Sequence, residues 1–433
     1  MAGPLKIVVA KRNGKELDEG QIGELMKAYV SGRLPDYQMA AFLMAVYFRG
    51  FSFAETAAWT RAMVESGTVL DLKDFSGPKI DKHSTGGVGD KTSLILTPLV
   101  ASLGITVPMI CGRSLGFTGG TIDKLESIPG FRTALSLMEA RRILAKTGCV
   151  MMAQSEEVAP ADRKLYALRD VTGTVESVPL IASSILSKKA AEGIEGVVFD
   201  VKFGDGAFFR SLSEASRLAK TLVKLSGLLK LKSVALLSSM EQPLGNAVGN
   251  ALEVEEAIEV MKGGGPKDLK DLTLSLAGWM LVLGSKAKNF KDGFSQAREA
   301  LETGAALNKF REVVEAQGGE GRVVEDPSLL PQAGRRLKLN SLQSGFLSKI
   351  HTRRLAEFLR SSGGGRSRLG ESVDPAVGLV LLKKLGDKVK KGEPVAVLHV
   401  GPTASPSLEE VSSLFEVTRK KVRSPALVRR VFR

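Results

Sequence analysis

The chain has 433 residues, of which 43% are hydrophobic, and this length exceeds the size at which one core usually gives way to several domains. Its 61 Lys and Arg outnumber its 47 Asp and Glu, and the net charge of +14 favours anionic ligands without selecting among phosphate, nucleotides, RNA and acidic membranes. Two cysteines, Cys111 and Cys149, are too few for a disulfide scaffold and are typical of a reducing compartment.

The N-terminal segment is predicted to form a small all-helical domain. Its first apolar run is interrupted by Lys11 and Arg12 before a signal-peptide core can form, so we expect a cytoplasmic protein. Residues 1–66 carry apolar side chains at helical spacing. The pattern from about 160 to 192 also predicts helices, and we expect them to return and pack on the N-terminal helices.

The middle of the chain alternates short β-rich runs with helical stretches, which is typical of an α/β fold. We assign about 78–155 and 196–335 to a larger α/β domain with a central, largely parallel mixed sheet. Its longest apolar stretch, near 272–284, is too short for a membrane span and is interpreted as a buried core helix. Residues of about 337–433 predict a C-terminal α+β module, whose final basic run we interpret as a solvated edge or tail.

The densest chemical signal is DKHSTGGVGDKTS at residues 81–93, where a predicted strand gives way to glycines and then to a helix. Backbone N–H groups exposed at such a turn, together with the helix dipole, favour an anion. A tight turn without a ligand is the alternative interpretation. Donors of the kind that bind phosphate are supplied by Lys82, Ser84 and Ser93.

Two nucleotide motifs are excluded at this loop. G-x-G-x-x-G is absent, and Asp90 stands before Lys91 where a Walker motif has glycine, so the loop suits one small phosphate better than a dinucleotide or ATP. His83 lies inside the loop and is the candidate general acid, because imidazole titrates near neutrality. A histidine merely hydrogen-bonded in the turn is the alternative.

A second glycine-rich segment, CGRSLGFTGGTIDKLESIPGF, again follows a predicted strand and opens a helix. We expect Thr121 and the backbone of residues 119–120 to serve the same anion. For Asp123, Lys124 and Glu126, an exposed first helical turn is the alternative to a functional role.

Four segments together resemble one enzyme family, the thymidine and pyrimidine-nucleoside phosphorylases. They are DKHSTGGVGDKTS, GRSLGFTGGTIDKLESIPGF, QSEEVAPADRKLYALRDVTGTVESVPLIASSILSKK and GNALEVEEA. The resemblance covers nearly the whole chain. It implies the reversible phosphorolysis of thymidine, deoxyuridine or uridine to a free base and a pentose 1-phosphate, and it implies a homodimer because family members are usually dimers.

The resemblance also implies two groups of site residues. The family's phosphate-binding positions fall on Lys82, Ser84, Ser93, Thr121 and, where the family usually has serine, Cys111. Its base-binding positions fall on Arg169, Ser184 and Lys188, with apolar positions at Leu115, Val175, Ile181 and Phe208. Spacing independently places Ser184 and Lys188 on one helix face, because they are four residues apart.

Phosphorolysis of this bond passes through a cationic sugar while negative charge builds on the departing base. We expect His83, Arg169 and Lys188 to be catalytic by stabilising that base anion, with phosphate as the nucleophile. The two domains would close over both substrates and exclude water, about hinges near 66–80, 155–162 and 190–196.

Three residues depart from the commonest family pattern. Cys111 replaces serine and is a weaker donor, Ser114 replaces a glycine and would be strained at a positive φ, and Phe117 replaces a histidine. Some bacterial members resemble enzymes that hold potassium near positions matching Gly89 and Glu253. Here Lys91 stands where those members have a small hydroxyl residue, and since its ammonium can replace the ion, we expect no obligatory metal.

Two other functions are kept as alternatives. A phosphoribosyltransferase of related architecture, such as the anthranilate type, would use phosphoribosyl pyrophosphate and magnesium and would show an acidic metal-binding pair. A basic nucleic-acid-binding protein without the chemistry is the other, but only 6% of residues are aromatic and no basic strip is interleaved with them. We therefore expect neither nucleic acid nor a membrane as a partner.

Overall fold

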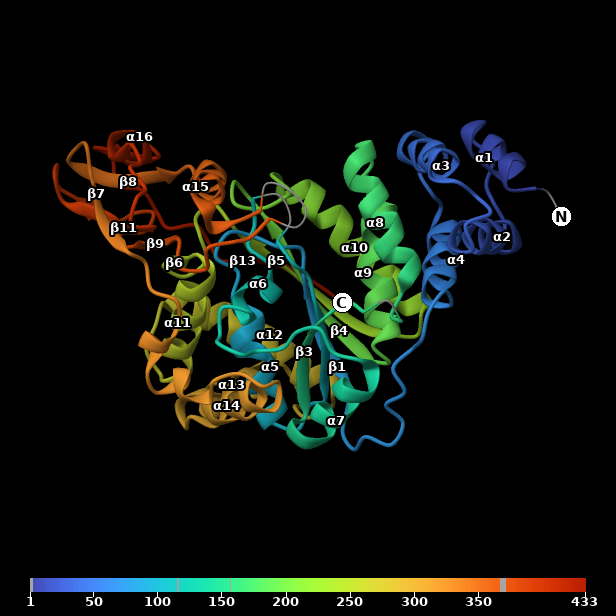
Figure 1. Cartoon of the computed structure of the whole chain (residues 1–433), viewed down its shortest axis with the longest axis horizontal. Helices are drawn as coiled ribbons and strands as arrows, with labels where there is room; N and C mark the ends of the chain where they lie inside the picture. The colour runs from blue at the N-terminus through green and yellow to red at the C-terminus, as the bar shows by residue number, and fades with distance from the viewer. Residues whose placement is uncertain (1–2, 115–116, 156, 367–370) are drawn as a thin grey trace.

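The computed structural model of the chain describes residues 3–114, 117–155, 157–366 and 371–433. The predicted α/β fold class is confirmed: a helical part and a C-terminal module lie at opposite ends of the molecule, with the α/β domain between them (Figure 1).

The helical part combines two segments that are far apart in sequence. Capping boxes at Asp18 and Ser52 begin two of its helices, and Phe42 stacks on Trp59 with ring centroids 5.5 Å apart in its core. Leu165 of the later segment is buried in that same core. The helices are α1 (Pro4–Arg12), α2 (Glu19–Val30), α3 (Asp36–Arg49), α4 (Phe53–Val64), α8 (Pro160–Thr172) and α9 (Val178–Ala191).

The central sheet is largely parallel. Strands β1 (Ile80–Ser84), β4 (Gly196–Phe203) and β5 (Lys232–Ser239) pair in parallel in that order. Strands β2 (Val107–Cys111) and β3 (Cys149–Ala153) form a second parallel pair, which a bridge between residues 79 and 106 aligns beside β1. Every residue of β4 is buried, as expected of a parallel strand with both faces covered.

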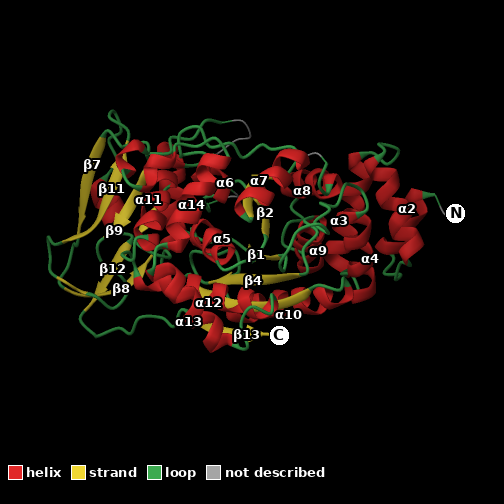
Figure 2. Cartoon of the chain, turned by 90° about the horizontal axis from the view of Figure 1, so that it is seen from below, coloured by secondary structure: helices red, strands yellow, loops and turns green. Residues whose placement is uncertain are grey.

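Helices cover both faces of this sheet (Figure 2). The apolar stretch near 272–284 lies in α12 and is largely buried, which confirms the predicted core helix. Within the described ranges, no helix is long and apolar enough to cross a membrane. One face carries α5 (Thr92–Ser102), α11 (Asn250–Met261), α12 (Lys267–Leu283), α13 (Phe290–Glu302) and α14 (Ala305–Ala316), and the other carries α7 (Leu137–Thr147), α9 and α10 (Leu212–Leu228).

The C-terminal module is built from two antiparallel sheets, ordered β6-β9-β11-β7 and β10-β8-β12. The short strand β6 (Ala247–Val248) comes from the α/β domain segment and pairs with β9, so it ties the module to that domain. The other elements are β7 (Arg335–Asn340), β8 (Gly345–Ile350), α15 (Thr352–Leu359), β9 (Gly378–Leu381), β10 (Lys388–Val389), β11 (Pro394–Val400), α16 (Leu408–Ser412) and β12 (Phe415–Thr418).

The basic run at the end of the chain forms a solvated edge, one of the two predicted alternatives, but this edge belongs to the central sheet and not to the C-terminal module. Residues Val428–Phe432 form β13, which pairs antiparallel with β5 at the edge of the central sheet. Phe432 packs on the core beneath β5, while Arg429 and Arg430 stay exposed. The apolar residues between the arginines therefore allow this basic run to pair as a strand of the sheet, which its charge alone does not predict.

Two glycines at helix ends provide a matched test of the junction between the helical part and the sheet. Gly193 has φ +69°, and a Cβ there would lie 2.2 Å from the carbonyl oxygen of Leu70. Gly173 has φ +65° but open space around it. We expect Gly173→Ala to cost about 1 kcal/mol for the left-handed backbone and Gly193→Ala to cost roughly 1–3 kcal/mol more, because the segments must also move apart. Thermal unfolding of both variants measures the difference, and equal losses would contradict this packing.

Candidate active site

The first glycine-rich loop leads from β1 into α5, as predicted. Gly86 and Gly89 have φ values of +84° and +77°, which favour glycine. A Cβ on Gly89 would lie 2.6 Å from the carbonyl oxygen of Leu244, so the loop lies directly against that segment.

Lys82 is a buried lysine without a carboxylate partner. Its Nζ donates to the hydroxyls of Thr92 at 2.7 Å and Ser93 at 3.2 Å, and no described carboxylate lies within ion-pair distance of it. Burial lowers the pKa of the Lys82 ammonium. Because an ammonium group has three N–H donors, one remains for a ligand, and an anion would supply the missing counter-charge.

Ser84 is turned away from this donor set. Its hydroxyl donates to Asp90 Oδ2 at 2.5 Å, and a serine has one hydrogen to give, so this arrangement leaves Ser84 no donor for a ligand. Although burial opposes ionisation of Asp90, the charges of Lys202, Lys82 and Lys124 hold the pKa of this carboxyl well below its usual value. The sequence analysis used Asp90 only to exclude a Walker motif and did not predict that it organises the loop, where it accepts from Ser84 and Thr92.

The second glycine-rich segment meets the first through Lys124. This side chain is 1% exposed, donates to the backbone oxygen of Asp90 at 2.6 Å and pairs with Glu253 at 2.8 Å. The interpretation of Asp123 and Lys124 as an exposed helical turn is therefore wrong, because both are buried, whereas Glu126 is exposed. Thr121 begins the short helix α6 (Thr121–Leu125), and its hydroxyl has no hydrogen-bond partner among the described residues.

The three departures from the family pattern are accommodated. Burial raises the pKa of Cys111 to about 12, so it remains a thiol. Ser114 is not among the described non-glycine residues with positive φ, and its N–H donates to Asp123 at 2.7 Å. The ring of Phe117 lies 5.3 Å from that of Phe208 and stacks against the Arg353 guanidinium on the C-terminal module.

Lys188 and Ser184 lie together on α9, at the boundary between the helical part and the sheet. Lys188 Nζ donates to Ser184 Oγ at 3.0 Å and to Asp162 Oδ2 at 2.5 Å. Asp162, which is 2% exposed, is a site residue that the sequence reasoning missed. Its spacing of seven residues from Arg169 places both on one face of α8, and this signal could have identified it.

Arg169 is held by the backbone that joins α8 to α9. Its guanidinium donates to the carbonyl oxygens of Thr174 at 3.3 Å, Leu180 at 3.2 Å and Val175 at 2.6 Å. These bonds use one N–H on each nitrogen, so one donor remains on each terminal nitrogen. The side chain is 3% exposed, and burial lowers its pKa while Asp162 opposes that shift.

His83 is under the influence of lysines from the first glycine-rich segment and from α9. Burial lowers the pKa of His83 well below its usual value, and the charges of Lys189, Lys188 and Lys82 add smaller contributions in the same direction. The neutral imidazole is therefore favoured, which argues against a general acid and for a hydrogen-bond donor. Its ring nitrogens have no hydrogen-bond partner among the described residues.

The apolar residues expected around a base are not gathered into one contact by this structure. Ile181 packs on the core between α9 and the sheet, and Val175 contributes its carbonyl oxygen to Arg169. Phe208 is 37% exposed, beside Phe117. Leu115 lies outside the described residues.

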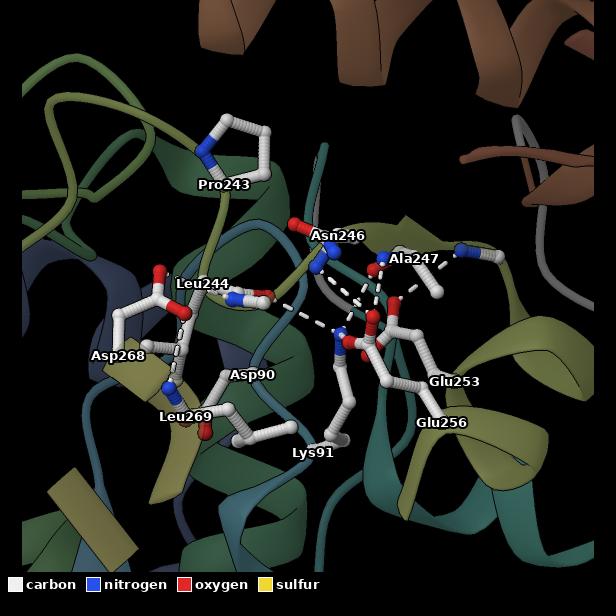
Figure 3. Close-up of polar contacts among 12 residues, drawn as sticks. Asp90, Lys91, Pro243, Leu244, Asn246, Ala247, Glu253, Glu256, Asp268 and Leu269 are labelled. Atoms are coloured by element: carbon white, nitrogen blue, oxygen red, sulfur yellow. Dashed lines mark hydrogen bonds and ion pairs between the residues drawn. The ribbon is translucent and has the colours of Figure 1, made fainter. Parts of the chain in front are cut away.

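The expected cation site contains a lysine. Figure 3 shows Lys91 directed at Glu256 and at the backbone of Leu244 and Ala247. The expectation that Glu253 serves this position is wrong, because its carboxylate pairs with Lys124 and Glu256 takes the place one helical turn later. Within the described ranges, no group of three or more His, Cys, Asp or Glu side chains is arranged for a metal ion.

A buried charged triad joins α9 to the sheet. Lys189 Nζ pairs with Asp81 on β1 and with Glu192 at 2.6 Å, and all three side chains are at most 1% exposed. Glu192 also accepts the N–H of Ile110 on β2 at 2.9 Å. Burial and the Asp81 carboxylate raise the pKa of Glu192 well above its usual value, so one ammonium serves one charged carboxylate and one neutral carboxyl.

Comparisons with known proteins cover almost the whole chain. Three domain families match: "Glycosyl transferase family, helical bundle domain" over residues 5–67, "Glycosyl transferase family, a/b domain" over 76–307, and "Pyrimidine nucleoside phosphorylase C-terminal domain" over 346–415. Similar curated relatives are the pyrimidine-nucleoside phosphorylases of Geobacillus stearothermophilus, 47% identical, and Bacillus subtilis (strain 168), 46% identical, each over 91% of both chains.

A solved structure shares the fold. Anthranilate phosphoribosyltransferase from Thermus thermophilus matches with a TM-score of 0.58 and 21% identity, over 72% of this chain and 99% of that chain. At this identity the similarity concerns architecture alone.

The triad generates a prediction about pH. Because its folded-state pKa is raised, Glu192 keeps its proton while the unfolded chain loses it, so this residue lowers stability as pH rises from about 4.5 towards that raised value. Glu192→Gln does not titrate, and its unfolding temperature should exceed that of the parent by a margin that grows from acid to neutral pH.

Lys189→Met is the contrasting variant. It leaves Asp81 buried without its counter-ion and should lose about 3–5 kcal/mol. Thermal unfolding over a pH series measures both variants, and a Glu192→Gln protein as unstable at neutral pH as Lys189→Met would show that Glu192 is ionised in the fold.

Proposed function

The chain belongs to the pyrimidine-nucleoside phosphorylase family of pentosyltransferases, and from this membership we propose that it splits thymidine and deoxyuridine with inorganic phosphate. The products are the free pyrimidine base and deoxyribose 1-phosphate, and the reaction is reversible. Uridine is the substrate that tests whether a 2′-hydroxyl is tolerated. The similarity to anthranilate phosphoribosyltransferase is one of fold and supports no second activity.

The observation that carries this proposal is the buried ammonium of Lys82, which has no direct carboxylate contact among the described residues. The other lysines buried in the described loop region, Lys91, Lys124, Lys189 and Lys202, have carboxylate partners, whereas Lys82 has only hydroxyls. Phosphate would supply its counter-charge and accept from Ser93 and Thr121. Ser84 would join only by giving up its bond to Asp90.

The base would bind on the opposite side, to Arg169, Ser184 and Lys188. Negative charge grows on the pyrimidine as the bond to the sugar breaks, so cations aimed at the base stabilise the transition state more than the ground state. Asp162 supports this arrangement, because it fixes the ammonium of Lys188 and opposes the loss of charge on Arg169.

His83 would act as a neutral donor to a base carbonyl rather than as an acid. Its lowered pKa and its position among Lys82, Lys188 and Lys189 support this role, since a second cation there is disfavoured. Phosphate bound at Lys82 would be nucleophile and counter-charge for the cationic sugar.

The positions of the two groups support domain closure as part of the proposal. The phosphate residues are on the sheet side and Arg169 is on α8 in the helical part, while α9 spans both. Closing the lobes would align phosphate with the sugar and exclude water, which favours phosphorolysis over hydrolysis.

A homodimer is part of the proposal. Two neighbouring helices of the helical part carry large apolar side chains that are exposed to solvent. They are Tyr37 (74% exposed) and Phe48 (77%) on α3, and Val171 (79%) on α8. Exposed apolar side chains on these two packed helices support self-association through this end of the molecule.

The direct test follows release of free base from thymidine, deoxyuridine and uridine, with and without phosphate. We expect release only with phosphate. Lys82→Ala should raise KM for phosphate, and Lys188→Ala should raise KM for the nucleoside, each with a loss in kcat/KM of about 100-fold, because each removes a buried charge contact of roughly 3 kcal/mol.

Two results would contradict the assignment. Phosphate-independent release in the parent would indicate hydrolysis. Unchanged kinetics in both variants would show that the activity resides elsewhere or in a contaminant.

Asp162 provides a sharper test of the base side. Asp162→Asn removes the carboxylate that fixes Lys188, and we expect kcat/KM for the nucleoside to fall about tenfold to 100-fold, with KM for phosphate unchanged. Asp162→Glu should recover part of the loss. The matched control is Asp170→Asn, an exposed carboxylate on the same helix, which should behave as the parent. A parallel loss in affinity for both substrates would instead indicate general damage to the fold.

A further inference from the structure

The oxygen atoms around Lys91 form a set that would suit a monovalent cation. Lys91 Nζ lies 2.5 Å from Glu256 Oε2, 2.7 Å from the carbonyl oxygen of Ala247 and 3.0 Å from that of Leu244 (Figure 3). Carbonyl and carboxylate oxygens are the usual ligands of hard cations. The ammonium group is already among them, so the residues present do not fit an added ion.

We propose that Lys91 is a built-in replacement for a bound alkali cation, and that this chain needs no monovalent metal for activity or stability. An ammonium group has the same charge as a potassium ion and a similar size. Its three N–H donors match three acceptors, and the side chain is 1% exposed, which leaves neither space nor charge for a second cation.

Glu256 is also fully engaged. Its Oε1 accepts the N–H groups of Asn246 at 2.9 Å and Ala247 at 3.0 Å, while Oε2 accepts from Lys91. The carboxylate therefore shapes the 244–247 segment and turns two of its carbonyl oxygens towards one point. Removing the ammonium would leave a buried negative charge and two carbonyl oxygens facing each other, which is unfavourable unless a cation enters.

The ammonium group of Lys91 fixes the first glycine-rich loop against the 244–247 segment. Lys91 precedes Thr92 and Ser93, whose hydroxyls hold Lys82. It draws the loop onto the 244–247 segment, where Gly89 fits only because it has no side chain. From the C-terminal module, Lys384 donates to the carbonyl oxygens of Pro243 and Gly245 at 2.7 and 2.6 Å, so the segment is held from both sides.

The test replaces Lys91 by serine and compares choline, sodium and potassium chlorides at equal ionic strength. The parent should show the same unfolding temperature and activity in all three salts. Lys91→Ser should lose about tenfold or more in kcat/KM in choline chloride, since a charge is left buried without a partner. Potassium should restore the rate saturably and raise the unfolding temperature, because an ion that binds only the folded chain stabilises it.

Two control variants make the result specific. Lys11→Ser removes another buried lysine, whose ammonium contacts the carboxylate of Glu55 at 2.6 Å and none of these carbonyl oxygens. It should lose stability equally in every salt. Adding Glu256→Gln to Lys91→Ser should abolish the potassium response, because the charged ligand is gone.

The unfolding measurement needs no substrate, so it stands whether or not the proposed phosphorolysis is found. A parent whose stability or rate depends strongly on potassium would overturn the inference. So would a Lys91→Ser protein that is unaffected in choline chloride, or one that remains unstable in every salt.

Discussion

Pairing of buried charges is the constraint on which the rest of this structure depends. Ammonium groups taken out of water are costly unless they are neutralised and hydrogen-bonded. Around the first glycine-rich loop, Lys91, Lys124 and Lys202 each reach a carboxylate, and together they fix the loop against α6, β4 and the 244–247 segment. Lys82 is held by hydroxyls alone. The network thus fixes the loop and leaves Lys82 as the buried ammonium of this group without a direct carboxylate contact, which is where the proposed phosphate would bind.

Helix α9 connects this network to the helical part of the molecule. Ser184 and Lys188 lie on the face directed towards the proposed base site, whereas Lys189 is buried against Asp81 on β1. Adjacent lysines therefore have different environments, because a helix turns by about 100° per residue. Lys189 secures the helix to the sheet, whereas Lys188 contacts Asp162 on α8 and Ser184 on its own helix.

Much of this arrangement could be predicted from the sequence, and the limits have physical causes. Periodicity and glycine placement were sufficient for the strand-to-helix turns and for the return of residues 160–192 to the N-terminal helices. Contacts between residues far apart in the sequence could not be predicted in this way. Glu253 and Glu256 lie nearly on one face of α11, so only the packing distinguishes the partner of Lys124 from that of Lys91.

The electrostatic environment of His83 could not be predicted for a related reason. Sequence gives its ordinary pKa, but burial and the converging charges of Lys189, Lys188 and Lys82 arise from elements that meet only in the folded chain. The burial of Lys124 was missed likewise, since its sequence context is that of an ordinary helix start. For His83 and Lys124, what escapes prediction is an electrostatic environment rather than an element of secondary structure.

The pairing of β13 with β5 has a consequence for biosynthesis. The entire C-terminal module is translated between these two strands, so during synthesis the ribosome-bound chain presents β5 with an open, apolar edge. Such an edge invites pairing with other nascent chains until the last strand emerges. Closure of this sheet edge therefore has to wait until the C-terminal module has been synthesised, although β5 itself is made much earlier.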